Sequence, residues 1–212
     1  KLEQADIITC ISKSTKKQVK KYFKKNAEVV YTPSLEIESV HRPRDIDFLY
    51  VGRAADPNKR FRLILNCLRD AGMPHNSLHI CGPDITMYGV YHGVVASSKL
   101  NDLYHQAKAV LLPSRIEGVG LSMVEGAMAG AIPITCTDNP TAKEFGFEEF
   151  SADPSVDSYS MAMRVAMMDY TNKKQRVSEI VQKQKLFDKF DKKTVAKKYV
   201  GFYEDRLNSI SI

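Results

Sequence analysis

The chain has 212 residues, of which 43% are hydrophobic and 26% are charged, with 11 glycines and 9 prolines. This composition is typical of a globular protein and excludes disordered, collagen-like and low-complexity chains. No apolar run approaches the ~20 residues of a membrane-spanning helix, and the opening residues do not resemble a secretory signal. The four cysteines lie far apart without a CxxC pair, which argues against zinc and disulfides. We therefore expect reduced cysteines and a cytoplasmic location.

The net charge of +6 is unevenly distributed along the chain. Residues 1–25 contain eight lysines and two acidic residues, and residues 171–212 contain 11 basic and 5 acidic residues. The middle part, 26–170, has 18 acidic and 12 basic residues. Because a uniformly basic protein would look different, nucleic acid is not an expected partner. The basic ends are interpreted as solvated lysine faces, and weak contact with an anionic membrane surface is the alternative.

Short β-branched runs alternate with helical patterns, which predicts an α/β fold: a parallel sheet with helices on both faces. The clearest predicted strands are Asp6–Cys10, Ile46–Val51, Ser77–Cys81, Ala109–Leu112 and Ile132–Thr135. Helices are indicated where apolar residues recur at i, i+3, i+4 and i+7, in the regions that begin at Phe61, Leu100 and Leu121. After Ser155 we expect no further strand, only a long helical stretch and a last amphipathic helix.

The first part of the chain follows a different pattern. A strand leads into a lysine-rich helix, Ser14 to Lys25, and then into a short strand, Glu28–Tyr31. The segment Thr32–Arg44 is irregular, carries two prolines and predicts a domain boundary. We therefore predict three parts: a first unit at 1–34, a Rossmann-like domain at 45–190, and a terminal helix at 191–212.

The most informative stretch runs from Leu111 to Ile134. A buried strand ends at Pro113, a loop with Gly118 and Gly120 follows, and a helix begins near Leu121. Such a unit points unpaired N–H groups and the positive end of a helix at the space above the sheet edge. In open α/β sheets ligands bind beyond the carboxyl ends of the strands, so the stretch predicts an anion site.

Two carboxylates stand eight positions apart in this stretch, Glu117 in the loop and Glu125 in the second helical turn. Side chains on a helix lean toward its N-terminus, so Glu125 can reach the space that Glu117 faces. A bidentate carboxylate suits a pair of vicinal hydroxyls, as on a ribose. The alternative is that both glutamates only complement the helix dipole.

A second cluster, Val51–Arg60, follows the strand at Ile46–Val51. Arg53 and Lys59 could together bind a diphosphate, Arg through its planar guanidinium and Lys as a point charge, or they could be ordinary surface charges. The cluster contains neither a Walker loop nor a GxGxxG fingerprint. An NAD-type Rossmann enzyme is therefore not expected.

Taken in order, these segments resemble the C-terminal nucleotide-sugar-binding domain of GT-B glycosyltransferases, specifically the retaining group 1 class (family 4). The resemblance covers about residues 6–145. The residues that carry it are Val51-Gly52-Arg53 with Lys59, then Pro113-Ser114, Glu117-Gly118-Val119-Gly120-Leu121 and Glu125, and finally Ala129-Gly130-Ala131-Ile132-Pro133-Ile134.

The resemblance implies a role for each matching residue. Arg53 and Lys59 would hold the donor diphosphate, Glu125 would bind the ribose hydroxyls, and Glu117 would lie against the donor sugar as the catalytic residue. The backbone N–H groups that would line the sugar and phosphate belong to Gly118, Val119, Gly120, Leu121 and Ser122. The residues near the nucleobase would be Gly82, Pro83, Asp84, Tyr91, His92, Gly93 and Val94. No metal ion or cofactor is expected, because the cations and the helix end neutralise the diphosphate.

The implied function is transfer of a sugar from a UDP-, GDP- or ADP-linked donor to an acceptor hydroxyl, with retention of anomeric configuration. The family has two Rossmann-like domains, so this chain would supply the donor-binding half, and the acceptor is not indicated. A non-catalytic nucleotide-sugar-binding module or one subunit of a split enzyme is the alternative. A non-hydrolysing sugar-nucleotide epimerase shares the fold, but its key acids and histidines have no counterpart at matching positions.

Two single positions and one loop depart from the pattern of the family. Arg60 stands where the family usually has glycine, and Val119 replaces a common aromatic residue. The glycine-rich loop after the strand at Ile132–Thr135 is replaced by Asp138-Asn139-Pro140-Thr141, although Glu144 matches the glutamate that usually follows it.

Overall fold

The computed structural model of the chain describes residues 5–210. Its centre is a six-stranded, wholly parallel sheet with the strand order β5-β4-β3-β6-β7-β8. The strands are β3 (Ile46–Val51), β4 (Leu78–Cys81), β5 (Val90–Gly93), β6 (Ala107–Leu112), β7 (Ile132–Cys136) and β8 (Ser151–Ala152). Within this sheet, β3 comes first in the chain, β4 and β5 are added on one side of it, and the chain then crosses to β6 on the other side. This confirms the predicted Rossmann-like α/β fold.

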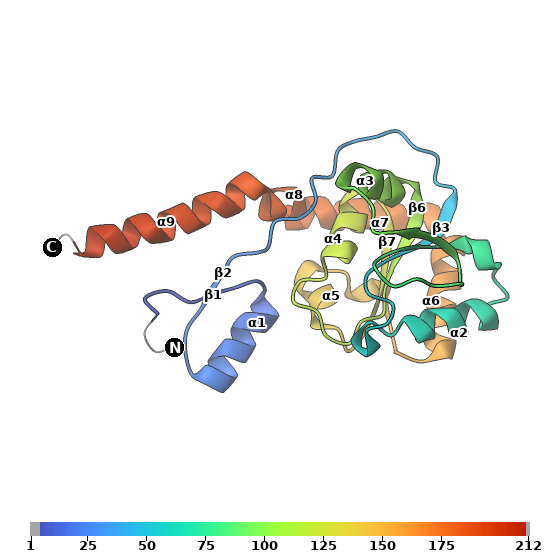
Figure 1. Ribbon diagram of the computed structural model, residues 1–212, viewed down its shortest axis with the longest axis horizontal. Coiled ribbons are helices and arrows are strands. Elements are labelled where there is room, and N and C mark those ends of the chain that lie inside the picture. Colours follow the sequence, from blue (N-terminus) through green and yellow to red (C-terminus); the bar gives the residue numbers. More distant parts are fainter. Residues whose placement is uncertain (1–4, 211–212) are drawn as a thin grey trace.

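Helices cover both faces of the sheet (Figure 1). Helix α2 (Phe61–Asp70) and helix α6 (Val156–Met168) pack together on one face. Helix α3 (Ser97–Gln106) and helix α4 (Leu121–Met128) lie on the other. Side chains of β3 alternate accordingly: Phe48 belongs to the cluster that includes α2, whereas Leu49 belongs to the cluster that includes α3.

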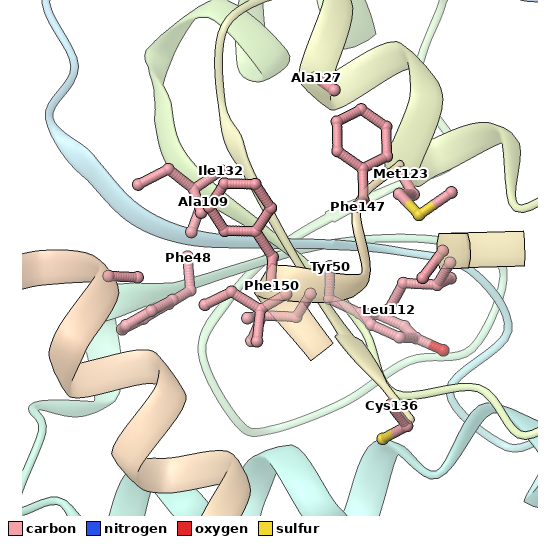
Figure 2. Close-up of a cluster of buried hydrophobic side chains, with 14 of the residues drawn as sticks. Phe48, Tyr50, Ala109, Leu112, Met123, Ala127, Ile132, Cys136, Phe147 and Phe150 are labelled. Atoms are coloured by element: carbon pink, nitrogen blue, oxygen red, sulfur yellow. The ribbon is translucent and has the colours of Figure 1, made fainter. Parts of the chain in front are cut away.

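The larger core cluster joins side chains of β3, β6, β7, α4 and the segment after α5 (Figure 2). Close packing of α4 on the sheet depends on Gly126, because a Cβ there would lie 2.5 Å from Cγ2 of Val110 on β6. All four cysteines are buried and free. The cysteines therefore act as small core residues, as the sequence predicts.

The first unit forms a small parallel sheet of its own, β1 (Thr9–Cys10) with β2 (Glu28–Val29). Between them lie α1 (Lys13–Gln18) and a π-helical turn, η2 (Val19–Phe23). The unit is anchored by Tyr31, which is buried against Phe145 and Phe190 with ring centroids 5.6 and 5.2 Å apart. The following segment has no regular structure until β3, as expected for Thr32–Arg44.

The last third of the chain is helical, as predicted. Helix α7 (Tyr170–Gln184) and helix α8 (Leu186–Phe190) lead into α9 (Lys192–Ile210), which extends away from the sheet (Figure 1). An ion pair of 2.9 Å joins Arg206 of α9 to Asp6 of the first unit. Within the described residues no helix combines the length and the apolar character needed to cross a bilayer.

The sequence did not predict β5, β8 or helix α5 (Pro140–Phe145). Strand β8 has only two residues, and β5 is a half-exposed edge strand, so neither produces a buried β-branched run. The first strand is shorter than the predicted Asp6–Cys10, because β2 pairs with only two of its residues. Three single 3-10 turns complete the fold: η3 (Pro57–Lys59), η4 (His75–Ser77) and η5 (Glu148–Phe150).

Candidate functional site

A pocket of about 380 Å³ opens at the carboxyl ends of β3 and β6, where the strand order reverses. This is the place where open α/β sheets bind ligands. Val51 ends β3, and the loop after β6 supplies the adjoining wall. The residues that line the pocket are Ile11, Thr32, Val51, Lys59, Tyr104, Glu117, Gly118, Val119, Gly120, Leu121, Ser122 and Glu125.

The loop from Glu117 to Gly120 directs the start of α4 at this pocket. Gly120 precedes the helix with φ +74°, a left-handed conformation that favours glycine, and no side chain caps the helix there. The N–H groups of Met123 and Val124 donate to the carbonyl of Gly120, whereas those of Leu121 and Ser122, at the start of the helix, have no partner in a preceding turn. Gly118 lies close to the first unit, because a Cβ there would lie 2.6 Å from Cδ1 at the end of the Ile11 side chain. The wall combines a positive helix end with closely exposed backbone, which suits an anionic ligand.

Lys59 and Glu117 form an ion pair inside the pocket. Lys59 Nζ lies 2.6 Å from Glu117 Oε1, and their side chains are only 18% and 13% exposed. Of the two residues predicted to hold a diphosphate, Lys59 therefore lines the pocket, paired with the predicted catalytic carboxylate. A ligand phosphate would compete with Glu117 for the ammonium group.

Asn58 fastens the two loops that carry this pair. Its side-chain amide donates to the carbonyl of Ile116 at 2.7 Å and accepts from the N–H of Ile116 at 3.0 Å. Its own carbonyl accepts from the N–H of Arg115 at 3.0 Å. Three hydrogen bonds between neighbouring loops fix the separation of Lys59 and Glu117. Asn58 was not predicted, since nothing in a single sequence pairs it with a residue 58 positions away.

Glu125 is held differently, although it lines the same pocket. Glu125 is only 8% exposed, and each of its carboxylate oxygens accepts a hydrogen bond. Oε1 accepts the N–H of Leu35 and Oε2 accepts the hydroxyl of Tyr104, each at 2.8 Å. Burial raises the pKa of Glu125 above its usual range, and the two hydrogen bonds act in the opposite direction.

Arg53 and the expected nucleobase region lie outside the lining of this pocket, as far as the described residues show. The Arg53 side chain is 67% exposed and pairs with Asp56 at 2.8 Å. Asp84 accepts the N–H of Ala55 at 3.1 Å, which fixes the β4–β5 loop beside the loop that carries Arg53. In that region the Tyr91 hydroxyl donates to the carbonyl of Gly82 at 3.0 Å.

The remaining residues of the expected nucleobase region surround this contact. The N–H of Gly82 donates to the carbonyl of Gly93 at 3.0 Å, and Pro83 follows Gly82 directly. His92 lies with its Nε2 2.9 Å from His79 Nδ1 on the neighbouring strand. Val94 is 80% exposed. The region thus consists of hydrogen-bonded backbone and side chains at the β4–β5 edge of the sheet, with Pro83 and Val94 exposed.

Two of the positions that depart from the family pattern, Arg60 and Asp138, pair with each other. Arg60 has φ +49° and turns away from Lys59, and its guanidinium binds both oxygens of Asp138 at 2.8 and 2.6 Å. Glu144 accepts the N–H groups of Lys13 and Ser14 at 2.8 and 3.3 Å and the hydroxyl of Tyr31 at 2.9 Å. In this chain Glu144 therefore fixes the first unit against the sheet domain.

Four residues of the pocket were not predicted: Ile11, Thr32, Val51 and Tyr104. Ile11 and Thr32 come from the first unit and the segment after it, and no local pattern assigns them to a site built on another unit. Tyr104 belongs to an amphipathic helix and carries the signal of a core residue. Among the described residues, no group of three His, Cys, Asp or Glu side chains could hold a metal ion.

The fold is shared with solved glycosyltransferase structures. A sucrose-phosphate synthase from Thermosynechococcus elongatus matches with a TM-score of 0.81 at 16% identity, over 98% of this chain and 60% of that one. Anabaena HepE, in complex with UDP and glucose, matches with a TM-score of 0.76 at 14% identity, over 95% of this chain and 64% of that one. The pneumococcal O-GlcNAc transferase GtfA, in complex with UDP and GlcNAc, matches with 0.72 at 15% identity, over 97% and 46%.

This chain thus spans less than two thirds of the length of these proteins, and at such identities the likeness establishes the fold alone. No match was found among curated proteins. The sequence itself matches the family described as Glycosyl transferases group 1 over residues 45–166, more than half of the chain. The chain therefore belongs to the group 1 glycosyltransferases.

Proposed function

We propose that this chain forms the donor-binding half of a glycosyltransferase that moves a sugar from a nucleotide sugar to an acceptor hydroxyl. The observation that carries the proposal is the single pocket that contains Lys59, Glu117, the start of α4 and Glu125. UDP is the first nucleotide to consider, since the structures of Anabaena HepE and pneumococcal GtfA contain UDP. Membership of the group 1 family supports the reaction class.

The diphosphate would lie between Lys59 and the N-terminus of α4. The ammonium group and the free N–H groups of Leu121 and Ser122 provide positive potential on two sides. Arg53, exposed at the rim, can turn from Asp56 toward a phosphate oxygen. These groups would stabilise the negative charge that develops on the leaving diphosphate during transfer. No metal ion is required for this charge neutralisation.

The ribose would bind at Glu125. Each oxygen of its carboxylate accepts one hydrogen bond from the protein, which leaves a lone pair on each for a ribose hydroxyl. The nucleobase would then extend toward Gly82–Asp84 and Tyr91–Val94, along the edge formed by β4 and β5. The exposed side chain of Val94 suits contact with the face of a base.

The donor sugar would lie against Glu117 once the diphosphate draws Lys59 away. Transfer breaks the bond between the anomeric carbon and a diphosphate oxygen and forms a bond from that carbon to the acceptor oxygen. We propose that the acceptor attacks from the face that the diphosphate leaves, so that the configuration is retained and the departing oxygen takes the hydroxyl proton. The carboxylate of Glu117 would stabilise the positive charge that develops on the sugar.

The division of the chain forms part of this proposal. Residues 45–190 would bind the donor, while the first unit and α9 would face the half that selects the acceptor. The ion pair between Arg206 and Asp6 supports the association of these two segments. A cytoplasmic location, with the lysine-rich ends near a membrane surface, is compatible with an acceptor held by that other half.

Titration calorimetry with UDP, GDP and ADP tests donor binding directly. At least one of them should bind, and its affinity should change little when magnesium is replaced by a chelator. Circular dichroism must show the same folded protein in every titration. If none of the three bound at millimolar concentration to folded protein, the assignment of the donor site would be wrong.

A further inference from the structure

We propose that Tyr104 is a positioning residue for the nucleotide, which orients the Glu125 carboxylate toward the ribose. This inference rests on the proposed ribose-binding role of Glu125. Tyr104 lies on α3 and Glu125 on α4, so the contact spans two helices. The observation behind it is the hydrogen bond of 2.8 Å from the fully buried Tyr104 hydroxyl to Glu125 Oε2.

The hydrogen bond fixes the plane of the carboxylate. Leu35 N–H holds Oε1 and the Tyr104 hydroxyl holds Oε2, so rotation about the last side-chain bond of Glu125 would break both contacts. Such a terminal torsion is broad when nothing restrains it. Because two vicinal hydroxyls need both oxygens in a defined orientation, loss of either donor would lower the fraction of protein that is ready to bind ribose.

A second contact keeps the two helices at the required separation. The half-buried guanidinium of Arg44 donates to the carbonyls of Tyr104 and Ala107 at the end of α3, and to the carbonyl of Ala129 at the end of α4. A cation placed at two helix C-termini is stabilised by both dipoles. Arg44 therefore fixes the C-terminal end of α3 relative to that of α4, and with it the distance from Tyr104 to Glu125.

The same hydrogen bond keeps the carboxylate charged. Burial raises the pKa of Glu125, whereas the bonds from Leu35 and Tyr104 lower it. Burial also raises the pKa of Tyr104, so its hydroxyl stays protonated and remains a donor at neutral pH. Without that hydroxyl, Glu125 would take up a proton at a higher pH and lose its ability to accept two ribose hydrogen bonds.

Removal of the Tyr104 hydroxyl leaves the other charged groups around Glu125 in place. Lys59 and Glu117 share the pocket and pair with each other. On the segment of Leu35, Glu36 pairs with Lys192 at the surface. A change in the pH profile that follows removal of the Tyr104 hydroxyl therefore reports on Glu125.

The test compares Tyr104→Phe with a matched variant, Tyr159→Phe. Tyr159 is also fully buried and donates its hydroxyl at 2.8 Å, but to the carbonyl of Ile134 on the other side of the sheet. Titration calorimetry with UDP and with uridine should show that Tyr104→Phe weakens both ligands about fivefold, the size of one ordinary hydrogen bond. The acid limb of affinity against pH should move to higher pH in Tyr104→Phe alone.

Three outcomes would overturn the inference. Tyr104→Phe could bind both ligands like the wild type with an unchanged pH profile, while Glu125→Ala weakens them; the ribose role of Glu125 would then stand without Tyr104. Tyr159→Phe could show the same loss and the same shift, which would indicate a general packing effect. If wild-type protein bound neither UDP, GDP nor ADP, the proposed function would fail and the inference with it. Thermal unfolding of both variants identifies a folding defect separately from these results.

Discussion

Lys59 and Arg60 are consecutive cations that form similar ion pairs in different places. Lys59 lies 2.6 Å from Glu117 inside the pocket, and Arg60 lies 2.6 Å from Asp138 outside its lining. The left-handed backbone of Arg60 separates the two side chains. Ion-pair length therefore does not separate the cation that lines the pocket from the one that lies outside it. What separates them is their position relative to the carboxyl ends of β3 and β6, where the strand order reverses.

The largest expected effect is that of Lys59→Ala on binding of the nucleoside diphosphate. Loss of a charge-assisted hydrogen bond to phosphate should cost about 1.5–3 kcal/mol of binding free energy. The parent nucleoside, which has no phosphate, should bind to the variant and to the wild type alike. Calorimetry with the diphosphate and the nucleoside measures both values.

Lys108→Ala provides the control for that experiment. Lys108 also pairs with an acidic residue, Asp47, at 2.6 Å, but on β6 and β3 away from the pocket. Its removal should leave both ligands unaffected. An equal loss for diphosphate and nucleoside in Lys59→Ala would indicate damage to the fold and contradict the assignment.

Arg53→Ala should have a smaller effect on the same binding reaction. The Arg53 side chain is 67% exposed, so water screens its contact with phosphate more strongly than that of Lys59. We expect a loss of about 0.5–1.5 kcal/mol, which increases when the salt concentration is lowered. A loss as large as that of Lys59→Ala, independent of salt, would show that Arg53 moves into the pocket when the ligand binds.

Arg60→Ala should affect stability and leave nucleotide binding unchanged. The side chains of Arg60 and Asp138 are 22% and 38% exposed, so the pair contributes at most about 1 kcal/mol to the free energy of unfolding. Arg60→Gly should lose less than Arg60→Ala, because glycine adopts the positive φ of this position without strain. Urea denaturation of the three proteins measures the difference.

The Arg60–Asp138 pair also predicts a pH dependence. The hydrogen bond from Arg60 lowers the pKa of Asp138 below its usual range. The contribution of the pair is therefore complete above the unfolded pKa, about 3.9, and is lost as the pH falls through the lower folded pKa. The stability difference between wild type and Asp138→Asn should be present at pH 6 and shrink in strong acid. A constant difference would show that the charge of Asp138 does not matter.

The sequence was most informative where the site is local. Strand β3 has both predicted ends because its buried run is bounded by polar residues. Glu117, Gly118 and Gly120 share one loop before α4, so spacing alone indicated that they face one pocket. Gly120 also marks a position whose positive φ favours glycine over other residues.

The sequence was least informative where the site depends on contacts between distant segments. Leu35 and Tyr104 meet Glu125 from positions 90 and 21 residues away. Ile11 reaches Gly118 from a separate small sheet. No periodicity specifies such contacts, because they are set by the packing of whole elements. A single sequence could therefore indicate candidate residues within one loop and helix, but not the residues from distant segments that contact them.

Among the residues proposed to contact the donor, Glu117→Ala should have the smallest effect on diphosphate binding. Removal of this carboxylate frees Lys59 and takes a negative charge away from the diphosphate, so the affinity for the nucleoside diphosphate should stay the same or rise by up to about threefold. Glu149→Ala is the matched control, because Glu149 pairs with Arg176 at 2.8 Å on the surface and should change nothing.

Transfer of the sugar should respond to Glu117 in the opposite way. The assay uses the donor-binding half together with the half that selects the acceptor. Glu117→Gln should then lower kcat far more than it raises KM, because the carboxylate acts on charge that develops only in the transition state. Gln keeps the size of the side chain and still loses the charge. Together, unchanged or tighter diphosphate binding and a reduced kcat would separate Glu117 from Lys59, its own ion-pair partner. If Glu117→Ala instead weakened the diphosphate as strongly as Lys59→Ala does, the carboxylate would serve to position the lysine, and the proposed catalytic role would be wrong.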